Sequence, residues 1–189
     1  MTIAVVLGNG KSRLELDLEK IKTKTTVYGC NALYRTFTPH YLIATDDGIA
    51  TEIQESGYSK TNEFYTRNPR PDTGAKKITL NFGYSSGPVA LSYAVSHKHS
   101  SIFLAGFDLK GDEGKFNNIY AGTANYKPVD ATETFFGNWV KQIESIVKSN
   151  PTIKFYRVNP WKNFTPNEWA NLRNLQNIDS KQFHSMINI

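Results

Sequence analysis

The first twelve residues place the strongest constraint on how this chain can fold. A run of apolar, mostly β-branched residues at 3–7 ends at a Gly-x-Gly turn, and Ser12 and a polar segment follow it. The run is apolar on both faces and too short for a helix, which is typical of a buried strand. The glycines let the chain turn sharply and bring backbone N–H groups close to a ligand.

This beginning has two interpretations. If Ser12 caps a following helix, then the strand, the glycine turn and the helix N-terminus together form an anion-binding site. The alternative is a plain tight turn, because Arg13 stands where the dinucleotide-binding pattern has its third glycine. The motif alone does not decide between them.

The length and composition fit one domain with a substantial core. The chain has 189 residues, of which 39% are hydrophobic. It has no apolar run of about eighteen residues, so we expect no membrane span. The apolar run at the N-terminus is short for a signal peptide and has no basic region before it, so we expect a cytoplasmic protein. The single cysteine, Cys30, allows no internal disulfide, and no Cys/His cluster has zinc spacing.

The charge gives a weak indication of partners. The formal net charge is +5, which favours phosphorylated or polyanionic partners. A nucleic acid therefore remains an alternative partner, although the chain has no long basic run.

Short apolar segments alternate with segments of helical pattern along most of the chain. Strands are expected at 3–7, 25–29, 41–45, 63–66, 101–105 and 153–158, a strand or extended stretch at 78–82, and helices at 14–21, 30–34, 49–54, 85–95 and 136–147. This alternation predicts an α/β fold, namely a Rossmann-like, mainly parallel sheet with helices on both faces.

Two segments stand apart from this alternation. Residues 109–130 form a long polar loop, and such a loop in a compact domain is usually functional or mobile, so we expect a lid. Asp130 and Glu133 have the spacing of a capping box before the helix at 136–147. Residues 159–189 form an aromatic and polar C-terminal extension that is expected to cover an edge of the sheet. We expect 1–189 to be a single domain.

Polar residues gather where the predicted strands end. In parallel α/β sheets, ligands bind beyond the carboxyl ends of the strands, which the fold brings together. The residues predicted there are Gly8, Asn9, Gly10 and Ser12 after the first strand, Asn31 after the second, Asp46 and Asp47 after the third, Ser85, Ser86 and Gly87 at a helix start, and Gly106 and Asp108 after the strand at 101–105. We therefore predict one ligand site at this edge.

Each of these residues also has an ordinary structural role. The amides of Asn9 and Asn31 can read a nucleobase edge or a ribose hydroxyl, but asparagine also suits turns, where it bonds its own backbone. Ser85-Ser86-Gly87 can hold a phosphate at a helix N-terminus or simply cap the helix.

The acidic and aromatic candidates leave similar alternatives. Asp46 and Asp47 can bind Mg²⁺ with phosphates or orient a sugar hydroxyl, or Asp46 caps the next helix. Asp108 is equally ambiguous. Tyr120 and Tyr126 in the long loop can stack on a substrate or merely cover the surface. None of the four histidines lies at a predicted strand carboxyl end, where a catalytic histidine would be useful.

Three of these motifs, in this order, resemble a known family. They are Gly8-Asn9-Gly10-x-Ser12, Cys30-Asn31-x-x-Tyr34, and Ser85-Ser86-Gly87 leading into the strand and turn at 101–108. This pattern is similar to the bacterial sialyltransferases of the Campylobacter type, glycosyltransferase family 42, and more widely to the clan of sugar- and pterin-phosphate enzymes with a Gly-x-Gly-Pro-Ser start. The resemblance covers most of the nucleotide-binding half and is fainter at 47–77 and after 130.

The resemblance implies a ligand and a mechanism. It implies that Asn9, Asn31, Ser86 and Gly87 contact a CMP-linked sugar donor, and that no metal or other cofactor is required. It also implies transfer by direct displacement, with a lid histidine as base and tyrosines beside the departing phosphate. Family enzymes often assemble into tetramers, so a homo-oligomer is an expectation by resemblance.

The chain departs from the family pattern in its acid–base groups. The lid has no histidine, since Tyr120-Ala121-Gly122 stands where the family has tyrosine, glycine and histidine. Other departures are Gly83 for an arginine, Lys11 for a proline, and Asp46-Asp47 for an asparagine-proline turn. Asp47, Asp108 and Tyr126 are the alternative candidates for the base.

The sequence thus predicts a glycosyltransferase-like transferase that binds a nucleotide-activated sugar and an acceptor at the strand carboxyl ends. One alternative is a catalytically inactive nucleotide-binding or structural protein that retains the fold. A further alternative is an enzyme that modifies nucleic acid, which the basic charge suggests.

Overall fold

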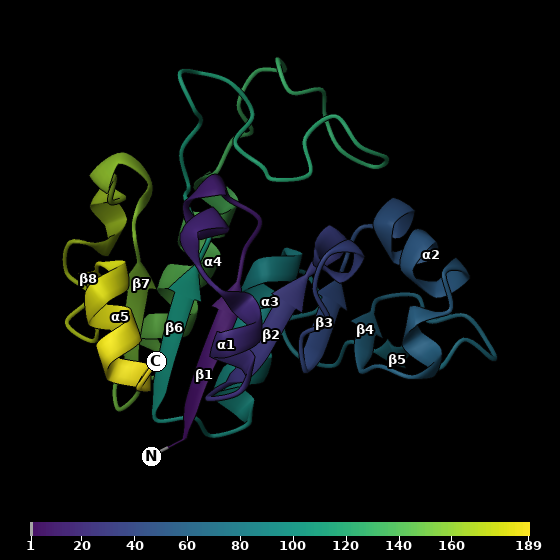
Figure 1. Ribbon diagram of the computed structural model, residues 1–189, viewed down its shortest axis with the longest axis horizontal. Helices are drawn as coiled ribbons and strands as arrows, with labels where there is room; N and C mark the ends of the chain where they lie inside the picture. The colour runs from purple at the N-terminus through teal and green to yellow at the C-terminus, as the bar shows by residue number, and fades with distance from the viewer. Residues whose placement is uncertain (1) are drawn as a thin grey trace.

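The computed structural model describes residues 2–189 and contains one parallel sheet. Eight strands lie in the order β5-β4-β3-β2-β1-β6-β7-β8, and every neighbouring pair is parallel (Figure 1). The strands are β1 Ile3–Leu7, β2 Thr26–Cys30, β3 Tyr41–Ala44, β4 Phe64–Thr66, β5 Lys76–Lys77, β6 Ser101–Ala105, β7 Lys154–Val158 and β8 Leu175–Ile178. The predicted Rossmann-like α/β fold is confirmed.

The central strands are buried on both faces because their alternate residues enter two different cores. Ala4 and Val6 of β1 face one core, which α3 and α4 cover, and Val5 and Leu7 face the other, which α1, α2 and α5 cover. The helices are α1 Leu18–Lys22, α2 Asp47–Glu55, α3 Ser86–Ser96, α4 Gly137–Lys148 and α5 Ser180–Ile187, with 3₁₀ segments η1 Lys11–Glu15, η2 Asn31–Arg35, η3 Tyr58–Lys60, η4 Trp161–Asn163 and η5 Asn167–Trp169.

The strand order reverses beside β1. The chain runs outward from β1 through β2, β3, β4 and β5, then returns to place β6 on the other side of β1. Loops that leave β1 and β6 therefore diverge at this switch point, where open α/β sheets bind ligands. The long loop between β6 and α4 rises above these strand ends and runs across toward the side of the sheet that carries α2 (Figure 1).

Two expectations about individual elements were wrong, and of the strand or extended stretch expected at 78–82 the strand does not form. The helix predicted at 14–21 is two short segments, because the chain is extended at Leu16 and the Asp17 carboxylate caps a new helix by accepting the Lys20 N–H at 3.0 Å. Leu14 is consequently 66% exposed. No strand forms at 78–82; the short strand is β5, immediately before it.

The capping box predicted at Asp130 and Glu133 does not form. The helix begins at Gly137 without a side-chain cap, and Glu133 instead accepts the Gly111 N–H at 2.8 Å, which closes the base of the loop. The extension at 159–189 was expected to cover an edge of the sheet, and it does so by continuing the sheet. It adds β8 beside β7 and then α5, which a capping box between Asp179 and Gln182 begins.

Neither a membrane span nor a metal-binding cluster is found in the described part of the chain. Among the helices of residues 2–189, none combines the length and the apolar character that crossing a membrane requires. Within the same residues, no three or more His, Cys, Asp and Glu side chains are grouped so as to hold a metal ion.

His99 and His40, which lie near the amino ends of the strands, favour their neutral form. The Tyr28 hydroxyl lies 2.7 Å from His97 Nδ1 and 2.9 Å from His99 Nε2, and burial followed by the charge of His97 lowers the pKa of His99. His40 accepts the Val27 N–H at Nδ1, 3.0 Å away, and burial lowers its pKa as well, with a smaller effect from a nearby lysine. Protonation of either ring works against the folded arrangement.

We expect the free energy of unfolding to fall as the pH drops below about 6.5. The unfolded chain binds protons at His99 and His40 near that ordinary pKa, whereas the folded chain binds them only at lower pH, so acid favours the unfolded state. Urea unfolding between about pH 8 and about pH 5 measures the slope. His99→Gln should reduce the slope without abolishing it, because His40 titrates in the same window. An unchanged slope in this variant would contradict the assignment.

Candidate functional site

A cavity of about 250 Å³ lies at the carboxyl ends of the central strands. Its walls come from the turns after β1, β2, β3 and β6, from the first turn of α3, from residues 116–118 of the β6–α4 loop, and from the start of α4. Of the residues predicted from the sequence, Gly8, Asn9, Gly10, Asn31, Asp46, Ser85, Ser86, Gly87, Gly106 and Asp108 line it. Segments far apart in the sequence therefore meet at the predicted edge, while Ser12, Asp47, Tyr120 and Tyr126 lie outside the lining.

The glycine turn after β1 is packed directly against the turn after β6. Gly8 donates its N–H to the Ala105 carbonyl at 2.8 Å, and Gly10 donates its N–H to the Gly106 carbonyl at 2.9 Å. A Cβ on Gly8 would lie 2.5 Å from the Gly106 oxygen, and Gly106 has a φ of +75°. These glycines allow the backbones of the two turns to approach closely. The N–H groups of Gly8 and Gly10 bond carbonyls of the protein rather than a ligand.

The anion site expected at the first turn is filled by the protein's own carboxylate. Asp108 accepts the Ser12 N–H at 3.1 Å, the Ser12 hydroxyl, and the Asn117 amide at 3.0 Å. Ser12 is not a helix cap, since Gly10 occupies the N-cap position of η1. The expectation that Ser12 caps the helix was therefore wrong. Asp108 is 4% exposed, and its carboxylate is held by three donors.

Arg157 on β7 fixes the turn that carries Asp108. Its guanidinium donates to the carbonyls of Phe107 at 2.9 Å and Asp108 at 2.8 Å, and also to that of Phe164. Burial lowers the pKa of Arg157 to about 10, so the side chain remains a cation at neutral pH. It is 1% exposed and bonds backbone oxygens rather than a carboxylate.

The two asparagines have different surroundings. Asn9 is 8% exposed; its amide donates to the Cys30 carbonyl at 3.2 Å and accepts from Arg13 at 3.3 Å, so it links the ends of β1 and β2. Asn31 adopts the left-handed conformation, with a φ of 55°. Its Oδ1 is buried and has no hydrogen-bond partner among the described residues. Of the two, Asn31 is the one whose side-chain oxygen makes no hydrogen bond within the described residues.

The first turn of α3 borders the cavity and has no side-chain cap. The Ser86 hydroxyl accepts the Thr45 N–H at 3.0 Å and lies 2.9 Å from the Thr45 hydroxyl, so it joins α3 to the end of β3. Ser85 donates its N–H to Gln142 at 2.9 Å, and its side chain makes no cap hydrogen bond. The partial positive charge of the helix N-terminus therefore borders the cavity at Ser86 and Gly87.

An aromatic wall faces this polar side. Phe116 from the loop and Phe136 and Trp139 from the start of α4 line the cavity, and the rings of Phe136 and Trp139 lie 5.5 Å apart. From the sequence, Phe136 and Trp139 fall in the helix expected at 136–147, and Phe116 was not singled out. The sequence did carry a signal that Phe136 and Trp139 could border the site. Both residues come directly after the long loop, at the start of the helix rather than deep within it.

The carboxylates after β3 differ in position. Asp46 lines the cavity, is exposed, and occupies the N-cap position of α2 as one alternative expected, but its side chain makes no cap hydrogen bond. Asp47 lies outside the lining and accepts the Asn68 amide at 3.0 Å. Asp46 is the lining carboxylate without a side-chain partner in residues 2–189, since Asp108 is fully engaged.

The loop tyrosines hold the loop to the domain. Tyr126 accepts the Ala32 N–H at 3.2 Å, and burial raises the pKa of its phenol above the ordinary value. The Tyr120 hydroxyl lies 2.7 Å from the Thr36 hydroxyl and accepts from Arg13 at 3.2 Å. A phenol whose pKa is raised is a poor general base at neutral pH, which weakens the case for Tyr126.

The fold and the cavity define a parallel α/β protein with a cavity at its topological switch point, the place where open α/β sheets bind ligands. A comparison of the chain with protein-family models, curated proteins and solved structures finds no match.

Proposed function

We propose that this protein binds a nucleotide-activated sugar in the cavity and acts as a glycosyltransferase-like transferase. The observation that carries the proposal is the meeting of three features in one cavity. These are Asn31, whose side-chain oxygen has no hydrogen-bond partner in the described residues, the uncapped first turn of α3, and the aromatic wall of Phe116, Phe136 and Trp139. An asparagine amide can hydrogen-bond a nucleobase edge or a ribose hydroxyl, and a helix N-terminus can bind a phosphate. Aromatic side chains can stack on a ring of the ligand.

The resemblance to the Campylobacter-type sialyltransferases supports a CMP-linked sugar as the donor. In that resemblance Asn31, Ser86 and Gly87 contact the nucleotide, and all three line the cavity. Asn9, the fourth such residue, also lines the cavity but bonds Cys30 and Arg13. For Asn9 we therefore propose a supporting role beneath the nucleotide.

Transfer requires a group that takes the acceptor proton. In the proposed step the acceptor hydroxyl oxygen bonds the sugar carbon, and the bond from that carbon to the phosphate oxygen breaks with its electron pair on the phosphate. The hydroxyl proton passes to a base. Asp46 fits this role best among the lining carboxylates, because Asp108 already accepts from Ser12 and Asn117.

A second candidate is a nucleotide-binding protein without turnover. It is favoured by the engagement of Asp108, Asp47 and Tyr126 with protein partners, which weakens the case for the three bases proposed from the sequence. Incubation with CMP-linked sugars separates the two candidates. Release of CMP, by transfer or by hydrolysis, supports the transferase, and tight binding without release supports the second candidate.

We expect CMP to bind wild-type protein and Asn31→Ala to weaken this binding about tenfold, because one buried hydrogen bond is lost. Calorimetric titration with CMP, CDP and UDP measures both. Asn177→Ala is the matched control, since this exposed amide lies on β8 and donates to Thr165. Failure of all three nucleotides to bind wild type would contradict the proposed function. Equal affinity of Asn31→Ala and wild type would remove Asn31 from the site.

A further inference from the structure

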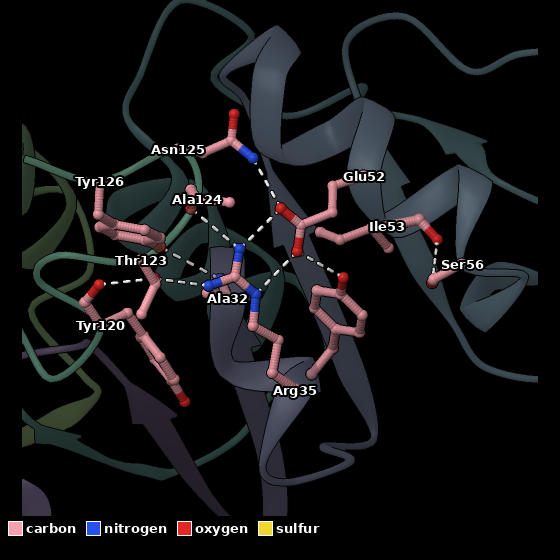
Figure 2. Close-up of polar contacts among 11 residues, drawn as sticks. Ala32, Arg35, Glu52, Ile53, Ser56, Tyr120, Thr123, Ala124, Asn125 and Tyr126 are labelled. Atoms are coloured by element: carbon pink, nitrogen blue, oxygen red, sulfur yellow. Dashed lines mark hydrogen bonds and ion pairs between the residues drawn. The ribbon is translucent and has the colours of Figure 1, made fainter.

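The distal part of the β6–α4 loop is fastened across the sheet by a polar cluster. We call residues 119–127 the strap. Figure 2 shows Arg35 and Glu52 at the centre of this cluster, with Thr123, Ala124 and Asn125 of the strap around them. Arg35 Nε and Nη2 donate to the two oxygens of the Glu52 carboxylate, each at 2.7 Å. This bidentate pair is the fixed element to which the strap attaches.

The strap attaches to both members of the pair. Asn125 donates its amide to Glu52 at 2.7 Å, and Arg35 donates to the Thr123 hydroxyl at 2.7 Å and to the Ala124 carbonyl at 3.0 Å. Tyr34 also donates to Glu52, at 2.6 Å. The hydrogen bond from Arg35 is the largest of the effects that hold the pKa of Glu52 at about 2, so the carboxylate stays charged at neutral pH.

Polar contacts, rather than burial, hold this part of the strap. Thr123, Ala124 and Asn125 are exposed, and burial contributes little there. Segments with exposed hydrogen bonds and few buried apolar contacts open at low free-energy cost. The contacts with Arg35 and Glu52 therefore govern whether this part of the strap is held or released.

The strap also contacts the segment that carries Asn31. Tyr126 accepts the N–H of Ala32, the residue directly after Asn31, and Arg35 ends the same 3₁₀ segment, η2. The strap thus bonds η2 near both of its ends. Asn31 itself is in the left-handed conformation, which asparagine adopts more readily than most other residues with a side chain.

We propose that Arg35 and Glu52 are positioning residues, which fasten the strap and thereby hold Asn31 in its left-handed conformation at the cavity wall. The proposal rests on the proposed function only where a nucleotide is used as a probe. Because coupling is reciprocal, a ligand that binds Asn31 tightens the strap, and a loosened strap weakens that ligand by the same factor.

Hydrogen exchange measured by mass spectrometry tests the fastening without a ligand. Glu52→Gln keeps the shape of the side chain and removes its charge. Asn125→Ala removes the donor on the strap and also places alanine at a φ of 65°, and both effects loosen the strap. In both variants we expect exchange to rise about tenfold in 119–127 and in 30–35, and to stay unchanged in β1 and β6. Glu144→Gln, which loses the exposed pair with Lys148, is the matched control and should change neither segment. If 30–35 keeps wild-type exchange in Asn125→Ala, the proposal is overturned, even where Glu52→Gln fails to fold.

Titration with CMP tests whether the strap acts through Asn31. Asn125→Ala should weaken CMP binding several-fold in the wild-type background and have no further effect in Asn31→Ala, because the amide that it positions is gone. Additive losses would overturn the proposal. If wild type does not bind CMP at all, the proposed function fails, and the exchange experiment still decides whether the strap and η2 are coupled.

Discussion

Arg157→Met is expected to lower the free energy of unfolding by at least about 3 kcal/mol and to abolish the cavity. Methionine has a similar length but cannot donate, so the carbonyls of Phe107, Asp108 and Phe164 lose the donor that now satisfies them. An unsatisfied buried carbonyl costs about 1–3 kcal/mol. The turn at 107–108 would then shift, and with it the carboxylate that fills the first-turn anion site.

Urea unfolding of Arg157→Met beside wild type measures this loss. Arg173→Met is the matched control, because that arginine is exposed, and we expect a change within about 0.5 kcal/mol. Arg157→Lys keeps the charge but lacks the planar fork, so it should recover only a minor part of the loss. A loss below about 1 kcal/mol for Arg157→Met would show that water replaces the guanidinium at little cost.

The fold was predictable where burial leaves a clear pattern in the sequence. β1 and β6 are short, apolar on both faces and followed by glycine turns, and they formed where expected. β8 escaped prediction because its middle residues, Gln176 and Asn177, are polar and exposed at an edge of the sheet. Only its pairing with β7, which is a tertiary event, makes that segment a strand.

The site was predictable in its location but not in its chemistry. The carboxyl ends of parallel strands meet in any such sheet, so the gathering of polar residues followed from the alternation of elements. Asn9 and Asn31 look alike in the sequence, and only the contacts of Asn9 with Cys30 and Arg13 distinguish them. Likewise, nothing local indicates that Ser12 would bond Asp108, which lies 96 residues away.

Gly8→Ala is expected to cost about 2–3 kcal/mol of folding free energy and to weaken CMP binding by more than about tenfold. The added Cβ would lie 2.5 Å from the Gly106 oxygen and 2.9 Å from its carbonyl carbon, and both are backbone atoms that cannot rotate away. The turns after β1 and β6 must then separate, which strains the hydrogen bond from Gly8 to Ala105. This separation would widen the cavity floor.

Gly83→Ala provides the matched control, because a Cβ there meets no atom within 4 Å. It should leave stability unchanged or raise it slightly, since alanine restricts the unfolded chain. Urea unfolding and CMP titration are measured for both variants. Gly8→Ala adds a crowded Cβ, whereas Gly83→Ala only restricts the backbone, so the difference between them measures the effect of crowding. If Gly8→Ala behaves like Gly83→Ala, the two turns are not in close contact. The cavity would then lack the rigid floor on which the convergence of Asn31, Asp46 and the first turn of α3 depends.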